Sequence, residues 1–270
     1  MLQRIIETSE FLKQKIGATP RIAIILGTGL GNLIDQIEIK KEVKYSEIPN
    51  FPISTVEGHA GKLIYGILGG KEVLAMQGRF HFYEGYTMSE VTFPIRVMSL
   101  MGVTHLFVSN ASGGLNPTYK VGDVVIIADH INMFGTNPLI GPNIKEFGPR
   151  FPDMSETYNK ALIAKAHQIA KEHQIQVQEG VYVGTSGPTF ETAAEYKHFR
   201  IIGGDLVGMS TVPEVIVAKH SGMICFGVSI VTDSGVPGQI KEISHEEVQK
   251  VANAAQPKMT LLIKELIENL

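Results

Sequence analysis

The chain has 270 residues, a hydrophobic content of 44% and a net charge of −3, so it can bury a sizeable core. This charge argues against a uniformly basic surface for nucleic acid, although a local basic pocket is compatible with it. Cys225 is the only cysteine, which excludes an internal disulfide, and no apolar stretch approaches the roughly 20 residues of a membrane helix. We therefore expect a cytoplasmic protein that binds neither nucleic acid nor membrane.

The first half of the chain predicts short buried strands, glycine-rich turns and one helix. In chain order these are a strand over 21–26, a hairpin of strands 63–68 and 73–76 joined at Gly69-Gly70, a helix from about Ser89 to Met101, and strands over 105–109 and 121–128. Two of the strands run into turns of small residues, Gly27-Thr-Gly-Leu-Gly31 and Asn110-Ala-Ser-Gly-Gly114. Segment 132–152 has much Gly and Pro and little periodicity, which is typical of a long functional or disordered loop.

The second half predicts a regular alternation of helices and strands. Asp153 or Ser155 is a candidate cap for a helix that runs to about His173. The remaining elements are strands near 177–185 and 223–232, helices near 192–202 and 212–221, and a last helix from about Ser244 onward, which Pro257 should kink. This alternation predicts an α/β fold, with one domain over residues 1–270 and a twisted, mixed, mainly parallel sheet flanked by helices.

Glycine-rich turns after strands are candidate anion sites, because their backbone N–H groups can point at a ligand. The first turn fits neither the dinucleotide fingerprint, since Asn32 replaces the third glycine, nor the P-loop, which needs a lysine. Considered alone, it is more simply a tight turn. The turns at 110–114 and 207–214 are equally compatible with ordinary connections between elements.

The segment Gln77-Gly-Arg79-Phe-His81-Phe-Tyr83-Glu84-Gly85 concentrates donors for an anion after a predicted strand. An extended conformation would place Arg79, His81 and Tyr83 on one side. Arg presents a fork of donors to phosphate oxygens, and a His held by a carboxylate such as Glu84 can stay protonated and donate as well. A solvated turn with an incidental ion pair is the alternative. The cluster and the small-residue turns together favour one shared anion site.

The segment Ser186-Gly-Pro-Thr-Phe190-Glu191-Thr192 places an aromatic ring next to a carboxylate where a helix begins. Phe190 could pack on a planar base and Glu191 could accept from its N–H groups, or Glu191 could only complement the helix dipole. His59 and His245 are lone histidines, each more typical of a surface position than of a ligand contact. The chain has no metal-ligand spacing and no Gly-x-Ser-x-Gly nucleophile elbow.

Considered together, these segments resemble the trimeric purine nucleoside phosphorylases that prefer 6-oxopurine nucleosides, from about Ile22 to the C-terminal helix. The matching stretches are Gly27-Thr-Gly-Leu-Gly31, Ile48-Pro-Asn-Phe-Pro52, Gly58-His-Ala-Gly61, 76–81 with Tyr83-Glu-Gly85, Asn110-Ala, 113–117, 187–191 and 208–214. The resemblance implies reversible phosphorolysis of nucleosides such as inosine and guanosine to the free base and (2-deoxy)ribose 1-phosphate, as in purine salvage. It implies inorganic phosphate as co-substrate and no cofactor or metal.

The resemblance also implies roles for individual residues. The catalytic residues would be Asp233, Glu191 and His81, with Glu84 orienting His81. The phosphate ligands would be Thr28, His59 from a loop over the site, Arg79, His81, the backbone at Ala111, and Ser210. The nucleoside would meet Tyr83 and Met209 at the ribose, His245 at its 5′-hydroxyl, and Phe190, Glu191 and Asp233 at the base. Phe147, in the long loop, would reach into the neighbouring subunit's pocket, which implies a homotrimer.

Asp233 departs from the family, many of whose members have Asn after this Thr. Asn can donate to O6 of a 6-oxopurine while it accepts from N7–H, whereas an ionised Asp can only accept, for example from the 6-amino group of adenine. Burial beside Glu191 could instead keep Asp233 protonated and restore a donor. We expect 6-oxopurine specificity, broadened by Asp233 towards adenosine.

Three alternatives rank lower. The first is a methylthioadenosine phosphorylase, which Asp233 favours, whereas Phe190-Glu191 and His245 disfavour it because a thioether lacks the 5′-hydroxyl that His245 would bind. The second is a dinucleotide-dependent oxidoreductase, which the incomplete glycine pattern disfavours. The third is a non-catalytic nucleoside-binding module, which an assay of phosphate-dependent base release would distinguish from an enzyme.

Overall fold

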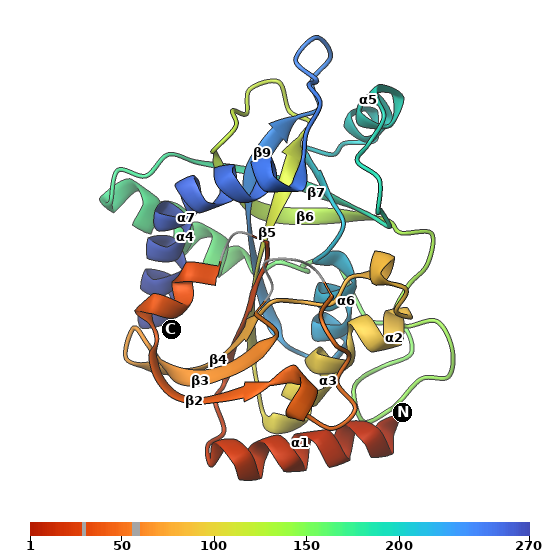
Figure 1. Ribbon diagram of the computed structural model, residues 1–270, viewed down its shortest axis with the longest axis vertical. Helices are drawn as coiled ribbons and strands as arrows, with labels where there is room; N and C mark the ends of the chain where they lie inside the picture. Colours follow the sequence, from red (N-terminus) through yellow and green to blue (C-terminus); the bar gives the residue numbers. More distant parts are fainter. Residues whose placement is uncertain (29–30, 56–59) are drawn as a thin grey trace.

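The computed structural model describes residues 1–28, 31–55 and 60–270, and this part of the chain forms a nine-stranded mixed sheet with helices on both faces (Figure 1). The strands are β1 (Ile22–Leu26), β2 (Glu38–Lys44), β3 (Lys62–Leu68), β4 (Lys71–Gln77), β5 (His105–Gly114), β6 (Val124–Met133), β7 (Val177–Thr185), β8 (Leu206–Gly208) and β9 (Ile224–Ser234). The helices are α1 (Leu2–Ile16), α2 (Met88–Val91), α3 (Phe93–Met101), α4 (Lys160–Glu172), α5 (Ala193–Ile201), α6 (Val212–His220) and α7 (His245–Glu268). The predicted α/β class is confirmed.

The sheet has the strand order β2-β3-β4-β1-β5-β8-β7-β6-β9, and an additional pairing of β9 with β5 closes its last five strands into a ring. Strands β4, β1, β5 and β9 are parallel to one another through the pairs β1–β4, β1–β5 and β5–β9. Their carboxyl ends therefore meet at one edge of the sheet, where α/β proteins place ligands. Antiparallel pairs, such as β3–β4 and β6–β9, make the sheet mixed.

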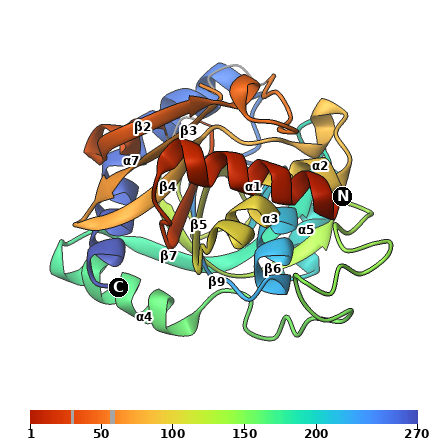
Figure 2. The same ribbon diagram turned by 90° about the horizontal axis from the view of Figure 1, so that it is seen from below.

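Two hydrophobic clusters fill the two faces of the sheet. In β1, Ala23 and Ile25 pack into a cluster with residues of α1, α3 and α6, whereas Ile22, Ile24 and Leu26 pack into a second cluster with residues of α4 and α7. Figure 2 shows these two groups of helices on different sides of the sheet. Because both faces of β1 are buried, its sequence is an uninterrupted apolar run rather than an alternating one.

Some predicted boundaries were wrong. The helix predicted from 89 to 101 is two helices, because Pro94 opens α3 and cannot continue the hydrogen-bond ladder of α2. Strand β5 does not end before Asn110 but continues to Gly114, paired with β9. Helix α4 begins at Lys160 under the cap Asn159, whose side chain accepts from the backbone N–H of Leu162.

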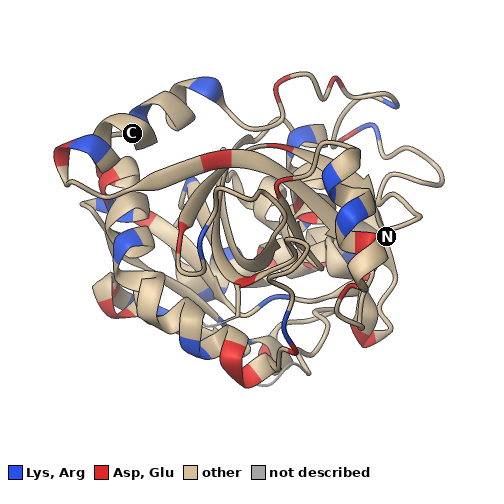
Figure 3. Cartoon of the chain, turned by 90° about the horizontal axis from the view of Figure 1, so that it is seen from above, with Lys and Arg blue, Asp and Glu red and all other residues tan. Residues whose placement is uncertain are grey.

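Asp153 caps no helix, and its carboxylate instead accepts from the backbone N–H and hydroxyl of Ser155 in a local turn. Pro257 lies inside α7, as expected, and Figure 1 shows that helix changing direction. Lys and Arg are interspersed with Asp and Glu along the chain (Figure 3), which agrees with the small net charge.

Candidate active site

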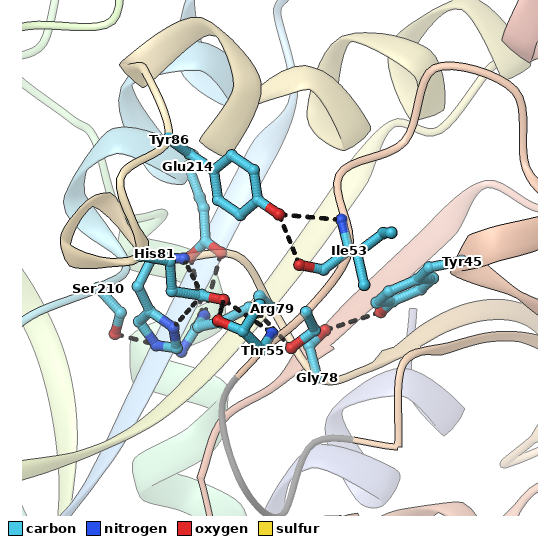
Figure 4. Close-up of polar contacts among 11 residues, drawn as sticks. Tyr45, Ile53, Thr55, Gly78, Arg79, His81, Tyr86, Ser210 and Glu214 are labelled. Atoms are coloured by element: carbon cyan, nitrogen blue, oxygen red, sulfur yellow. Dashed lines mark hydrogen bonds and ion pairs between the residues drawn. The ribbon is translucent and has the colours of Figure 1, made fainter.

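Arg79 lies two residues beyond β4, is 1% exposed, and forms the centre of a buried polar group at the sheet edge (Figure 4). Its Nε donates to Glu214 Oε1 over 3.0 Å and its Nη2 to Glu214 Oε2 over 2.8 Å. Its Nη1 donates to the carbonyl of Ser109 over 2.7 Å and to the hydroxyl of Ser210 over 3.2 Å. The bidentate edge of the guanidinium therefore faces a carboxylate of the protein, and its Nη1 side faces Ser210.

Glu214 was not among the predicted site residues, although its position has a local reason. It lies in the first turn of α6, where a carboxylate complements the positive end of the helix dipole. The preceding cap, Thr211, is fully buried and adopts φ +67°, an unusual value for a β-branched residue. Asn110 donates to the Thr211 hydroxyl over 2.8 Å. This bond between β5 and the start of α6 fixes the turn that carries Ser210.

Gly27 lets β1 approach β5 closely at the same edge. A Cβ at Gly27 would lie 2.7 Å from the carbonyl of Ser109 and 3.1 Å from Nη1 of Arg79, so a side chain there would displace the buried guanidinium. Thr28, the next residue, lines the pocket that Arg79 also lines. Gly27 thus has a steric role at this edge of the sheet.

His81 is 6% exposed and held by Glu84, as expected. Glu84 Oε1 lies 3.1 Å from His81 Nδ1 and accepts from the His81 backbone N–H over 2.7 Å. Glu84 Oε2 accepts from the backbone N–H and the hydroxyl of Thr55. Burial alone would raise the pKa of Glu84, but the bonds from His81 and Thr55 lower it to about 2. The His81 ring stacks on Tyr83 at 4.7 Å between centroids.

In the protein by itself, the bond between Glu84 and His81 does not hold the pKa of His81 at its ordinary value. Burial lowers the pKa of His81 below its ordinary value, although the bond to Glu84 acts to raise it, and the nearby Arg79 lowers it further. A bound anion would act in the opposite direction, because a negative charge favours the imidazolium form.

Glu191 and Asp233 supply two carboxylates to the pocket from the chain just before α5 and from the end of β9. Thr185 donates to Glu191 over 3.4 Å. Tyr196 donates to Asp233 Oδ2 over 3.2 Å, and Thr232 to Asp233 Oδ1 over 3.0 Å. Burial raises the pKa of both carboxyl groups, and the charge of Asp233 raises that of Glu191 further. The pair can therefore hold a proton more readily than free carboxylates.

One pocket gathers the predicted site residues, except for His59 and Phe147. The predicted residues that line it are Thr28, Arg79, His81, Tyr83, Ala111, Phe190, Glu191, Met209, Ser210, Asp233 and His245. His59 lies outside the described residues. The pocket also contains Asn110, from the small-residue segment noted in the sequence, and Thr232, for which no role was predicted; they donate to Thr211 and to Asp233, respectively.

Phe147 lies in the interior of its own chain rather than on its surface. Its side chain is 5% exposed and packs in the core of its own chain, with the Arg96 guanidinium 4.8 Å from the ring centroid. This burial disfavours the role expected for Phe147 in a neighbouring subunit's pocket. The exposed aromatic residue of the same loop is Phe151, which is 86% exposed.

No helix in the described ranges is both long and apolar enough to cross a membrane. In the same ranges, no group of three His, Cys, Asp or Glu side chains is placed to hold a metal ion.

The fold and this pocket define an enzyme of the phosphorylase superfamily, and the chain belongs to that family, whose model matches residues 21–268. It is 51% identical to purine nucleoside phosphorylase 1 of Bacillus subtilis, over 99% of this chain and 98% of the relative. Purine nucleoside phosphorylase of Schistosoma mansoni, solved with adenosine, has a TM-score of 0.95 at 43% identity, covering 100% and 98% of the two chains. The structure of that enzyme with inosine has a TM-score of 0.93 at 41% identity, covering 100% and 97%. Within the superfamily, the chain is thus a homologue of the purine nucleoside phosphorylases over nearly its whole length.

Proposed function

We propose that this chain is a purine nucleoside phosphorylase that cleaves inosine, guanosine and their 2′-deoxy forms with inorganic phosphate, as one domain and without a further cofactor. The observation that carries the proposal is the composition of one pocket. Arg79, Ser210 and His81 supply donors for an anion, and Glu191 and Asp233 supply carboxyl groups for the edge of a base. Such a combination suits a substrate pair of phosphate and nucleoside.

The reaction needs positioned charge rather than a protein nucleophile. As the C1′–N9 bond breaks, its electron pair moves to the purine and the ribose becomes cation-like, while a phosphate oxygen forms the new bond to C1′ from the opposite face. The phosphate held beside Arg79 and Ser210 would stabilise the ribosyl cation. A protonated carboxyl at Glu191 would stabilise the charge that develops on the base, which the raised pKa of Glu191 supports.

A substrate panel run with and without phosphate tests the proposal. We expect release of hypoxanthine from inosine and of guanine from guanosine only when phosphate is present, together with ribose 1-phosphate. Base release that needs no phosphate would indicate a hydrolase, and binding without any release would indicate a nucleoside-binding module. Methylthioadenosine should be a poor substrate, because it offers no 5′-hydroxyl to His245.

Asp233 supports a wider range of bases than the 6-oxopurines alone. Replacing it by Asn, in Asp233→Asn, should lower kcat/KM for adenosine by about tenfold or more and leave inosine cleaved, because the change replaces an acceptor by an amide with a donor. Kinetic constants for both nucleosides on the two proteins measure this. If adenosine is cleaved by neither protein, the broadening does not exist.

The long loop suggests how subunits would complete one another's sites. We infer a homotrimer in which Phe151, rather than Phe147, enters the neighbouring pocket, because Phe151 is the exposed ring of this loop and has the Arg150 guanidinium 5.7 Å from its centroid. Phe151→Ala should raise KM for nucleoside at least about tenfold, since a buried aromatic contact contributes on the order of 1–2 kcal/mol, with the trimer intact by light scattering. Unchanged kinetics in a trimeric Phe151→Ala protein would contradict this role.

A further inference from the structure

Tyr196 lies behind the carboxyl groups at the base end of the pocket and does not line the pocket itself. It follows Glu191 by five residues and lies one turn into α5, whose start is fixed by a reciprocal pair of bonds between Thr192 and Glu195. Its side chain is 4% exposed and packs in a small apolar cluster. The other buried members of that cluster are Leu115, Val183, Phe199 and Val207. The hydroxyl is the polar end of this buried ring, and it donates to Asp233 and also interacts with Glu191, the other carboxyl group of the pocket.

The backbone on both sides holds this contact between hydroxyl and carboxylate in place. A Cβ at Gly235 would lie 2.4 Å from Cδ1 of Tyr196, so the ring lies flat against the chain that follows β9. A Cβ at Gly113 would lie 3.0 Å from Oδ2 of Asp233, the oxygen that accepts from Tyr196. A side chain at Gly235 would displace the Tyr196 ring, and one at Gly113 would displace the Asp233 carboxylate. The close approach of these two backbone segments therefore positions the hydroxyl against the carboxylate.

Each oxygen of Asp233 already accepts one hydrogen bond from the protein, Oδ2 from Tyr196 and Oδ1 from Thr232. Donors on both oxygens favour the ionised carboxylate, whose remaining lone pairs can only accept from a ligand. Burial acts against this and raises the pKa of Asp233. The protonation state of Asp233 that a bound purine meets therefore depends on these two donors. Thr232 lies beside Asp233 on β9, whereas Tyr196 donates from α5.

We propose that Tyr196 is a positioning residue that sets the base preference by keeping Asp233 an acceptor, so that the 6-amino group of adenosine can bind alongside 6-oxopurines. The proposal rests on the proposed function of the pocket. Without the hydroxyl, the buried carboxyl would favour its protonated form, which donates to a 6-oxo group and is a weaker acceptor for a 6-amino group than the carboxylate is. Tyr196 would thus increase the preference of the site for 6-aminopurine nucleosides without contacting the substrate.

Other charged groups surround Asp233, and all of them stay in place when only the Tyr196 hydroxyl is removed. They are Glu191 before α5, His245 at the start of α7 and, lining the cavity that continues beyond Asp233, Lys241, Glu242, Glu247 and Lys250. A change in base preference on removing the hydroxyl therefore reports on the contacts of Tyr196 with Asp233 and Glu191, and an Asp233→Asn background separates the part that comes from Asp233.

The test is kcat/KM for adenosine and for inosine on the wild type and on Tyr196→Phe, measured across a range of pH. We expect the adenosine-to-inosine ratio to fall about tenfold, since a hydrogen bond to a charged group has roughly that effect. The acid limb of the adenosine profile should move to higher pH. Gly235→Ala, which displaces the ring but keeps the hydroxyl, should lower the same ratio.

Two controls separate this role from a general effect of losing a buried hydroxyl. Tyr119→Phe removes the bond from Tyr119 to the carbonyl of Glu179, outside the pocket, and should leave the ratio unchanged. In an Asp233→Asn background, Tyr196→Phe should no longer change the ratio. An unchanged ratio in Tyr196→Phe, or an equal fall in the Asn background, would overturn the proposal. A wild type that cleaves inosine but not adenosine would also overturn it, whereas a wild type that cleaves no nucleoside with phosphate would refute the proposed function itself.

Discussion

Arg79→Met is expected to abolish phosphorolysis and to destabilise the fold in the same protein. Removing a donor to the reacting phosphate should lower kcat/KM for phosphate by about a thousandfold. The change also leaves the Glu214 carboxylate, which is 3% exposed, without the guanidinium that now neutralises it. Breaking a buried ion pair from one side costs on the order of 3–5 kcal/mol. Steady-state kinetics and denaturant unfolding measure the two losses separately.

The double variant Arg79→Met/Glu214→Met distinguishes the catalytic loss from the structural one. With both charges removed, no buried charge is left unpaired, so stability should return to within about 1–2 kcal/mol of the wild type. Activity should not return, because the anion still lacks its donor. A stable double variant that recovers phosphorolysis would show that Arg79 serves only to neutralise Glu214.

This pair also shows where prediction from sequence ends. Arg79 could be predicted, because Arg and His lie close together in the sequence after a strand. Its partner Glu214 lies 135 residues away in the sequence, in helix α6. Glu214 had a local explanation as a residue of a helix first turn, and nothing in its neighbourhood indicated a buried cation. The same limit applies to Tyr196. The sequence indicates only an apolar residue of an amphipathic helix, because the Asp233 that accepts from its hydroxyl lies on a distant strand, β9.

The sheet edge was predictable for a different reason. Each of β1, β4 and β9 ends in residues that lie at the carboxyl edge as soon as the strands are parallel, so short sequence segments were enough to assemble Thr28, Arg79 and Asp233 in one pocket. The long loop had no such periodicity. Phe147 and Phe151 lie four residues apart in this loop, and tertiary packing in the core, which includes a contact with Arg96, makes Phe147 the buried one.

Phosphate binding is expected to take up a proton, and this uptake should depend on Glu84. Burial keeps the pKa of His81 below 6.5 in the free protein, so the imidazole is largely neutral at neutral pH. A phosphate anion beside it would raise this pKa and draw in a proton, with the ionised Glu84 on Nδ1 supporting the charge. Titration calorimetry in buffers of different ionisation enthalpy measures the number of protons taken up. Binding with no buffer dependence would show that His81 does not change its charge.

In Glu84→Gln the amide cannot neutralise an imidazolium, and its N–H groups would oppose the Thr55 backbone N–H that now donates to Oε2. We expect phosphate affinity to fall about a hundredfold, because hydrogen bonds to charged groups contribute roughly 1.5–3 kcal/mol, and proton uptake to disappear. Glu90→Gln is the matched control, since Glu90 makes the same pair of bonds to Thr87 at the start of α2, outside the pocket. If both variants weaken phosphate binding equally, the effect belongs to the local turn geometry and not to the charge on His81.

The same two groups determine how the fold responds to acid. The pKa of Glu84 is lowered from 4.5 to about 2, so the stability that its bonds provide is complete above pH 4.5 and is lost as the pH falls towards 2. The pKa of His81 is also lowered, from 6.5, so the unfolded chain binds a proton more readily than the folded one and stability already begins to fall below pH 6.5. Phosphate, which favours the protonated His81, should therefore offset the loss that comes from His81 and leave the loss that comes from Glu84. Unfolding measured against pH with and without phosphate should show that phosphate stabilises the fold at neutral pH and that this stabilisation grows as the pH falls, because protonation of His81 strengthens phosphate binding.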